Sequence, residues 1–243
     1  MSLRQTSDDA AIDPRERLIV ALDFADPARA RGLVERLDDS VAFYKIGLEL
    51  ATGPGYFDLL DWLLARGKRV FADLKLYDIP ATVGAAVKRL SGCGASFLTV
   101  HGDRAITEAA AANKGSGLRV LAVTVLTSMS QADLKQMGIT LGVEDLTLLR
   151  ARQAIGSGCD GVIASGLEAA RLREALGNGA LIVTPGIRSI EARGLDDQKR
   201  VVTPRRAFES GADYIVVGRP VRDAQDPYEA ASKIQAEIAS VFE

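Results

Sequence analysis

The sequence predicts a single α/β domain with a (β/α)8 TIM barrel fold, and three observations support this prediction. Short runs rich in β-branched residues alternate with longer Ala-, Leu-, Arg- and Glu-rich segments. Eight such runs fit into the 243 residues, whereas a doubly wound sheet more often stops at about five to seven strands. Many runs are preceded by a Gly-polar-apolar sequence, as in GLRVLAV and GADYIVV, which is expected of repeated β-α units.

The eight predicted strands are apolar runs that follow turn signals. In chain order they cover residues 17–23, 41–47, 68–75, 95–102, 118–128, 160–165, 180–187 and 213–220. The predicted helices cover residues 27–37, 55–66, 82–91, 106–114, 143–157, 168–176, 203–210 and 227–241, and several follow Asp, Ser or Thr, which cap helix N-termini. We expect one barrel domain over residues 17–243, preceded by a flexible tail over residues 1–16.

Charge and composition argue against several classes of protein. The chain has 30 Lys and Arg against 32 Asp and Glu, so it has no excess of basic residues for nucleic acid. Its longest apolar stretch, residues 120–126, is too short to span a membrane, and the N-terminus has no signal-like apolar region. Cys93 and Cys159 fit small buried thiols in a reducing compartment. These features predict a cytoplasmic protein that binds a small molecule and neither nucleic acid nor membrane.

Polar residues gather at the carboxyl ends of the predicted strands, where barrels of this type place their chemistry. In chain order they are Asp23, Lys45, Asp73, Lys75, His101, Thr127, the Pro185-Gly186-Ile187-Arg188 turn and the Gly218-Arg219 turn. Charges of alternating sign at one rim would cost on the order of several kcal/mol in desolvation unless they paired. We therefore favour a functional site over ordinary strand-end ion pairs. The lone His101 is interpreted as a structural residue.

The segment FADLKLYDIP, residues 71–80, carries the densest group of charges. If residues 68–75 form a strand, Asp73 and Lys75 point to the same face because side chains alternate. The opposite face is apolar enough to carry a covering helix and consists of Val70, Ala72 and Leu74. Asp78 follows in the loop before Pro80. The face with the two charges is therefore the one that needs a functional explanation.

The last two strands are followed by features that fit a phosphate site. Arg219 and the backbone N–H groups of the Gly218 turn lie where barrels commonly bind phosphate. Residues 188–201 form a long segment for a βα loop and include Gln198, which suits a lid over an anionic group. An ordinary surface loop, and a solvent-facing Arg219, are the alternatives.

Several separated motifs resemble those of the orotidine 5'-monophosphate decarboxylase family in its bacterial form. FADLKLYDIPATV matches the family signature D-x-K-x-x-D-I-P-x-T, and ALDF, YKIG, VTVLTSM, VTPGIR, DDQKR and VVGRPV occur in the family's order. The match runs from Leu18 through nearly the whole chain, with no departure at a motif position. The resemblance implies removal of CO2 from C6 of the pyrimidine to give UMP, in de novo pyrimidine biosynthesis, with no metal and no organic cofactor.

The resemblance also implies a role for each matching residue. It places Asp73 and Lys75 at the reacting carbon and Asp23 and Lys45 beside the ribose, with Lys45 and Asp78 completing a catalytic network of charges. It implies a homodimer in which Asp78 and Thr82 reach into the neighbouring subunit's site. The remaining implied substrate-binding residues are Thr127 at the pyrimidine, Pro185, and Arg188, Gln198, Gly218 and Arg219 at the phosphate.

Two alternatives remain open at this point. A magnesium-dependent sugar-phosphate decarboxylase or aldolase of the same suprafamily shares the D-x-K-x-x-D core, but Lys45 argues against it because an ammonium group repels a metal ion. A non-catalytic phosphate-binding barrel would need Arg219 and the lid but not Lys75. In the favoured hypothesis Lys75 stabilises a carbanion at C6 and then protonates it.

Overall fold

The computed structural model describes residues 12–188 and 202–242, and its sheet is a closed barrel of eight parallel strands. Each strand pairs with the next in sequence, and β8 pairs with β1 to close the barrel. The strands are β1 (Leu18–Ala21), β2 (Phe43–Gly47), β3 (Arg69–Leu76), β4 (Phe97–His101), β5 (Arg119–Val123), β6 (Gly161–Ile163), β7 (Leu181–Thr184) and β8 (Tyr214–Val217). This topology confirms the predicted (β/α)8 fold.

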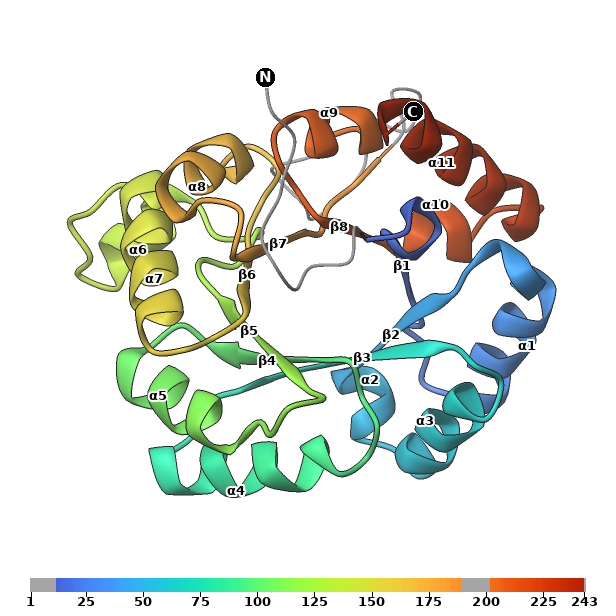
Figure 1. Ribbon diagram of the computed structural model, residues 1–243, viewed down its shortest axis with the longest axis horizontal. Coiled ribbons are helices and arrows are strands. Elements are labelled where there is room, and N and C mark those ends of the chain that lie inside the picture. Colours follow the sequence, from blue (N-terminus) through green and yellow to red (C-terminus); the bar gives the residue numbers. More distant parts are fainter. Residues whose placement is uncertain (1–11, 189–201, 243) are drawn as a thin grey trace.

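Helices form a ring outside the barrel (Figure 1). They are α1 (Pro27–Leu37), α2 (Leu48–Ala51), α3 (Tyr56–Leu64), α4 (Pro80–Ser91), α5 (Arg104–Asn113), α6 (Gln131–Gln136), α7 (Val143–Gly156), α8 (Ala169–Leu176), α9 (Pro204–Glu209), α10 (Arg219–Arg222) and α11 (Pro227–Phe242). Three helices were not predicted from the sequence, namely α2, α6 and α10, because helices of four to six residues are too short to show a helical period. Among the described residues, no helix combines the length and the apolar character that crossing a membrane requires.

Both faces of the strands are buried, as expected of a parallel barrel. Side chains such as Val20 and Ala72 face outward and pack in one large cluster with the helices. Side chains such as Ile19 and Phe71 face inward and form a second cluster inside the barrel. The predicted alternation along β3 is therefore confirmed, since Val70 and Ala72 belong to the outer cluster and Phe71 to the inner one.

Aromatic side chains fill the N-terminal end of the barrel. Phe43 and Phe97, the first residues of their strands, lie with ring centroids 5.0 Å apart, and Tyr214 meets Phe43 edge-on at 6.0 Å. The Arg69 guanidinium lies 4.4 Å from the Phe43 ring centroid and pairs with Glu16 at 2.5 Å. These side chains close the N-terminal end of the barrel, so a site can open only at the C-terminal end.

Residues 12–16, which the sequence analysis assigns to the tail, contribute to this closure. Pro14–Glu16 form a short 3-10 helix, whose preceding residue Asp13 accepts a hydrogen bond from the Arg15 N–H at 2.9 Å. Ile12 packs against the cluster inside the barrel. The described structure thus contains ordered turn geometry ahead of the predicted domain start at residue 17.

The fifth strand differs from its predicted extent of residues 118–128, because β5 ends at Val123. The apolar run does continue, but Val125 leaves the sheet and packs with Leu134 of α6 in a small separate cluster. An apolar run alone does not show where sheet pairing stops. Thr127 consequently lies in the loop after β5 and not at a strand end.

Candidate active site

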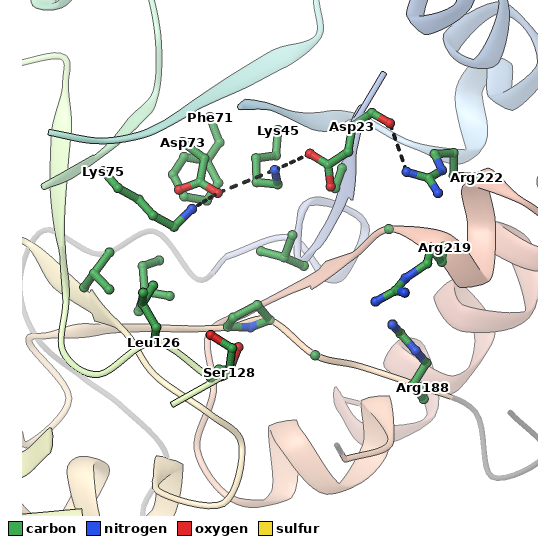
Figure 2. Close-up of a pocket in the computed structure, with 18 of the residues that line it drawn as sticks. Asp23, Lys45, Phe71, Asp73, Lys75, Leu126, Ser128, Arg188, Arg219 and Arg222 are labelled. Atoms are coloured by element: carbon green, nitrogen blue, oxygen red, sulfur yellow. Dashed lines mark hydrogen bonds and ion pairs between the residues drawn. The ribbon is translucent and has the colours of Figure 1, made fainter. Parts of the chain in front are cut away.

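A cavity of about 470 Å³ opens at the C-terminal ends of the strands. Figure 2 shows side chains from many strands converging on it. The predicted site residues that line this cavity are Asp23, Lys45, Asp73, Lys75, Thr127, Pro185, Arg188, Gly218 and Arg219. Residues that are far apart in the sequence therefore meet in one place, because every strand of a parallel barrel delivers its end to the same rim.

Three predicted site residues are not part of this cavity in the described chain. Asp78 and Thr82 are exposed, and the Asp78 carboxylate accepts a hydrogen bond from the adjacent Ile79 N–H at 2.6 Å. Gln198 lies outside the described residues, as does the predicted lid of residues 188–201 except for Arg188. The predicted network of charges therefore lacks Asp78 within one chain, since Asp78 follows β3 on the outer surface.

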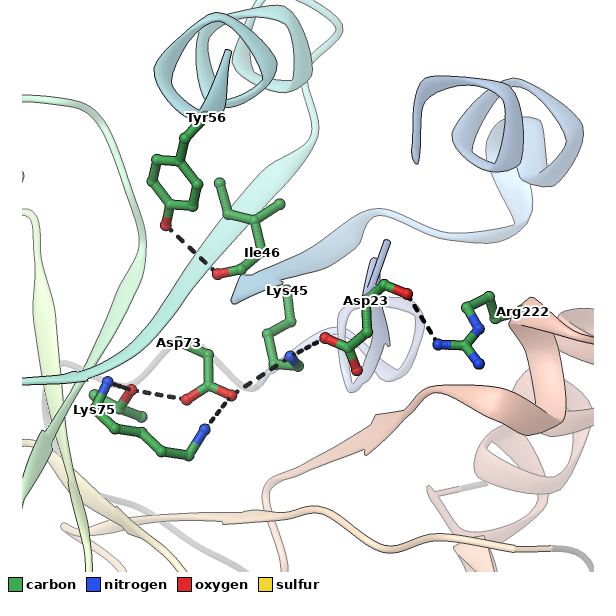
Figure 3. A network of polar contacts seen from close by, with 8 residues as sticks. Asp23, Lys45, Ile46, Tyr56, Asp73, Lys75 and Arg222 are labelled. Atoms are coloured by element: carbon green, nitrogen blue, oxygen red, sulfur yellow. Dashed lines mark hydrogen bonds and ion pairs between the residues drawn. The ribbon is translucent and has the colours of Figure 1, made fainter. Parts of the chain in front are cut away.

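The remaining four charges form a row of alternating sign, which we call the charge chain (Figure 3). The Lys45 ammonium donates to Asp23 Oδ1 at 2.8 Å and lies 3.5 Å from Asp73 Oδ2. The Lys75 ammonium donates to the same Asp73 oxygen at 2.8 Å. The Lys45 side chain is 10% exposed and the Lys75 side chain 30%, so Lys75 is the more accessible of the two ammonium groups.

A glycine at the end of β2 leaves room for this arrangement. A Cβ atom at Gly47 would lie 3.1 Å from the Lys45 ammonium nitrogen and 3.6 Å from Asp23 Oδ1. The contact to the ammonium nitrogen is tighter than an ordinary van der Waals contact, so Lys45 would have to shift by a few tenths of an ångström. The YKIG motif therefore supplies both the lysine and the space in which it pairs with Asp23.

The charge chain keeps its buried members ionised. Burial alone would raise the pKa of Asp73, but the adjacent Lys45 and Lys75 ammonium groups outweigh it and hold that pKa below its ordinary value of 3.8. Burial alone would lower the pKa of Lys45, but Asp73 and Asp23 outweigh it and the pKa is raised above 10.5. At neutral pH the cavity thus presents a fixed carboxylate between two ammonium groups.

The other end of the cavity is cationic. Figure 2 shows the Arg188 and Arg219 side chains facing one another on the side away from Lys75. Arg188 is 7% exposed, and its backbone N–H donates to the Val202 carbonyl at 3.1 Å. Guanidinium groups bind phosphate through several N–H donors at once, so this end suits an anionic group at a distance from the charge chain.

Sequence reasoning missed Arg222, which also lines the cavity. Its guanidinium donates to the Asp23 carbonyl at 2.9 Å and pairs with the Asp223 carboxylate at 2.6 Å. It thereby links α10, next to the Gly218 turn, to the end of β1. The spacing of four residues from Gly218 is one helical turn, but α10 itself was not predicted, so this signal could not be used.

The apolar part of the lining was also missed. It consists of Ala21, Phe71, Val123, Val125, Leu126, Ile163 and Val216. In the sequence these residues are indistinguishable from ordinary core residues of a barrel. They give the cavity a low-polarity wall on which a flat ring can pack.

His101 does not line the cavity, which agrees with its interpretation as a structural residue. Its ring lies 4.6 Å from that of Tyr77, and the side chain is partly buried. Burial is the largest influence on its pKa and lowers it, Asp103 raises it, and Arg150 and Lys75 lower it further, so the net change is downward. His101 is therefore mainly neutral at pH 7.

The closed barrel and the charged cavity at its C-terminal rim define a (β/α)8-barrel enzyme. The model of the orotidine 5'-phosphate decarboxylase / HUMPS family matches residues 16–234, and the chain belongs to this family. The chain is 58% identical over 227 residues to an orotidine 5'-phosphate decarboxylase of Methylococcus capsulatus, covering 93% of each chain. It is 56% identical over 228 residues to one of Stenotrophomonas maltophilia, covering 93% of this chain and 94% of the relative.

Solved structures show the same relationship. The crystal structure of orotidine 5'-phosphate decarboxylase from Lactobacillus acidophilus has a TM-score of 0.80 and 36% identity, and the match covers 92% of this chain and 99% of that one. The orotidine 5'-phosphate decarboxylase from Pyrococcus horikoshii has a TM-score of 0.73 and 28% identity, covering 91% and 99%. The resemblance seen in the sequence motifs thus extends to the fold over nearly the whole chain.

Proposed function

We propose that this protein decarboxylates orotidine 5'-monophosphate to UMP and CO2 in pyrimidine biosynthesis, using no metal and no organic cofactor. The names of its relatives support this substrate. The observation that carries the proposal is the Asp73 carboxylate held between two ammonium groups, at the end of the cavity away from Arg188 and Arg219. A phosphate on the arginines would direct the pyrimidine toward Lys75.

Lys75 supplies the chemistry at the reacting carbon. Loss of CO2 leaves an electron pair on C6, and a nearby ammonium group stabilises that negative charge. At an effective dielectric of about 20, unit charges about 4 Å apart interact by about 4 kcal/mol, which corresponds to roughly a thousandfold in rate if the interaction is made only in the transition state. Lys75 then donates its proton to C6, which completes UMP. One side chain serves both steps.

Asp73 has a different part in this mechanism. Its carboxylate accepts a hydrogen bond from the Lys75 ammonium at 2.8 Å and so orients that group. It also places negative charge where the substrate carboxylate lies in the proposed pose, so that loss of neutral CO2 relieves a repulsion. Lys45 offsets part of the cost of burying this carboxylate.

The first test of the proposed function is a spectrophotometric assay of orotidine 5'-monophosphate with EDTA-treated protein. Loss of substrate absorbance with formation of UMP is the expected result. No loss with EDTA, but turnover of a sugar phosphate when Mg2+ is added, would favour the metal-dependent alternative. That outcome is not expected, because the Lys45 ammonium lies within 2.8 Å of Asp23 and 3.5 Å of Asp73, where a metal ion would need those carboxylates.

Replacing Arg219 with alanine is expected to raise KM for the nucleotide by about ten- to a hundredfold, because one guanidinium contact to phosphate is lost. The measurement is steady-state kinetics with orotidine 5'-monophosphate and with orotidine, which has no phosphate. The nucleoside should be turned over equally by the wild type and the variant. Arg104→Ala, which removes an exposed arginine on α5, is the control. An equal loss with both substrates would contradict phosphate binding by Arg219.

The proposal includes a homodimer in which Asp78 and Thr82 complete the partner's site. Both residues are exposed in the single chain, and the adjacent apolar side chains of Tyr77 and Ile79 are each 65% exposed. Exposed apolar side chains beside polar site residues fit a surface that is covered by a second copy.

Mixing inactive Lys75→Ala and Asp78→Ala chains under subunit exchange is therefore expected to restore activity. Random pairing gives mixed dimers in half of the population, each with one intact site in two, so about a quarter of the wild-type activity should return. The control mixes Lys75→Ala with the Lys75→Ala/Asp78→Ala double variant, which leaves no intact site in any dimer. Absence of rescue in the first mixture, with exchange shown by mass spectrometry, would count against a shared site.

A further inference from the structure

Thr99 is a buried polar residue that the mechanism above does not use. It lies in the middle of β4 with 0% exposure, and its neighbours Leu98 and Val100 belong to the outer cluster, so Thr99 points into the barrel. Its hydroxyl donates to Asp73 Oδ1 at 2.8 Å and accepts from the Lys75 backbone N–H at 3.0 Å. These two hydrogen bonds connect Thr99 to Asp73 and to Lys75, the two residues proposed to act on the substrate.

The pairing of β3 with β4 is interrupted at this point. Ala72 pairs with Leu98, but the next pair is Leu76 with Val100, so β3 uses more residues than β4 over the same length. Within this bulge Lys75 has a φ of 47°, a left-handed conformation that is costly for a residue with a Cβ. The Lys75 N–H cannot make a regular ladder bond here, and the Thr99 hydroxyl supplies its acceptor.

The hydrogen bonds also fix the Asp73 carboxylate. Oδ2 is occupied by the two lysine ammonium groups, and Oδ1 by the Thr99 hydroxyl. A hydroxyl has a single proton, so donation to Asp73 leaves only its lone pairs for the Lys75 N–H. The Asp73 carboxylate therefore cannot rotate without losing a hydrogen bond on one side. The Lys75 backbone N–H is bound to the same Thr99 hydroxyl oxygen that donates to Asp73.

We propose that Thr99 is a positioning residue, whose hydroxyl locks the Asp73 carboxylate and the strained Lys75 backbone into one unit. This inference rests on the proposed function, in which those two side chains act at the reacting carbon. A β-branched side chain that only filled space would be replaced by valine without effect. The Thr99 contacts instead require an oxygen that donates on one side and accepts on the other.

The test compares Thr99→Val, which removes the hydroxyl at constant shape, with Thr99→Ser, which retains it. Thr107→Val is the matched control, because Thr107 is also fully buried and its hydroxyl bonds to the Arg104 carbonyl within α5. We expect Thr99→Val to lower kcat by about ten- to a hundredfold with KM changed by less than about threefold, while Thr99→Ser and Thr107→Val stay within about threefold of wild type. Equal losses in Thr99→Val and Thr107→Val, or no loss in Thr99→Val, would overturn the proposal.

A titration of Asp73 by carbon-13 NMR of its carboxyl group gives a second readout that does not depend on turnover. Loss of a donor to the carboxylate destabilises its charged form, so the Asp73 pKa should rise in Thr99→Val and stay unchanged in Thr107→Val. The titratable groups that act on Asp73 are the same in all variants: Lys45, Lys75 and Tyr56 interact with it directly. Asp23 interacts with Lys45, and His101 with Lys75. An unchanged pKa would refute the proposal, whereas a raised pKa in a protein that fails to decarboxylate the substrate would refute only the proposed function.

Discussion

Replacing Lys75 with alanine is expected to reduce kcat by at least about a thousandfold, while the affinity for UMP changes by less than about threefold. The variant loses both the charge that stabilises the C6 carbanion and the proton that replaces CO2. Binding of UMP depends on the rest of the cavity, including the arginines at its opposite end. Single-turnover kinetics measures the chemical step, and calorimetric titration measures the affinity for UMP.

Lys75→Arg separates the two functions of this side chain. A guanidinium group keeps the positive charge but gives up its proton far less readily, so this variant should also be inactive if proton donation is essential. Lys233→Ala, which removes a lysine that is 74% exposed on α11, is the control. Turnover within about tenfold of wild type in Lys75→Ala would refute the mechanism, because no other ammonium group in the charge chain has comparable access to the cavity.

The barrel itself could be predicted because its strands and its rim leave strong signals in the sequence. Eight apolar runs gave the architecture, and α1 begins and ends at the predicted residues, Pro27 and Leu37, because Asp26 caps it and Pro27 fits its first turn. The charged strand ends gave the site, since parallel strands bring their ends to one rim. Lys45 and Asp73, which lie 28 positions apart in the sequence, are thus found 3.5 Å apart.

The features that could not be predicted depend on strand-pairing geometry or on contacts to the backbone. Thr99 resembles any β-branched residue of a strand, and its function is visible only once the bulge between β3 and β4 places it opposite Asp73. Arg222 acts through the backbone carbonyl of Asp23, which carries no residue-specific signal. Asp78 was expected to reach into the neighbouring subunit's site, and in the single chain it is exposed.

Replacing Asp73 with asparagine is the second change with a large expected effect. The variant keeps the shape of the side chain but leaves Lys45 and Lys75 facing a neutral amide. Without the carboxylate their mutual repulsion lowers the pKa of at least one ammonium group, so the alkaline limb of the pH-rate profile should move to lower pH. We expect kcat to fall by about a hundred- to a thousandfold at neutral pH, measured by steady-state kinetics with orotidine 5'-monophosphate.

The same substitution should lower the free energy of unfolding by roughly 3–5 kcal/mol at neutral pH, because a buried ion pair loses one partner. The pKa of Asp73 is lower in the folded protein than its ordinary value of 3.8, so the unfolded chain binds the proton first as pH falls. The stabilisation by the Asp73 carboxylate is therefore complete above pH 3.8, its ordinary pKa, and is lost as pH falls through the lower pKa of the folded protein. Urea unfolding should show that the difference in the free energy of unfolding between wild type and variant is constant near neutrality and narrows below about pH 3.8.

A double variant, Lys45→Met with Asp73→Asn, distinguishes stability from catalysis. Removing the second buried charge should recover much of the lost stability, because the two charges that lose their partners, Asp23 and Lys75, have side chains 42% and 30% exposed and remain partly hydrated. Activity should not return, since Lys75 still lacks the carboxylate that holds it. Recovery of turnover together with stability would mean that Asp73 serves only the fold, whereas recovery of stability alone would show that the ion pair of Lys45 and Asp73 is required by the reaction itself.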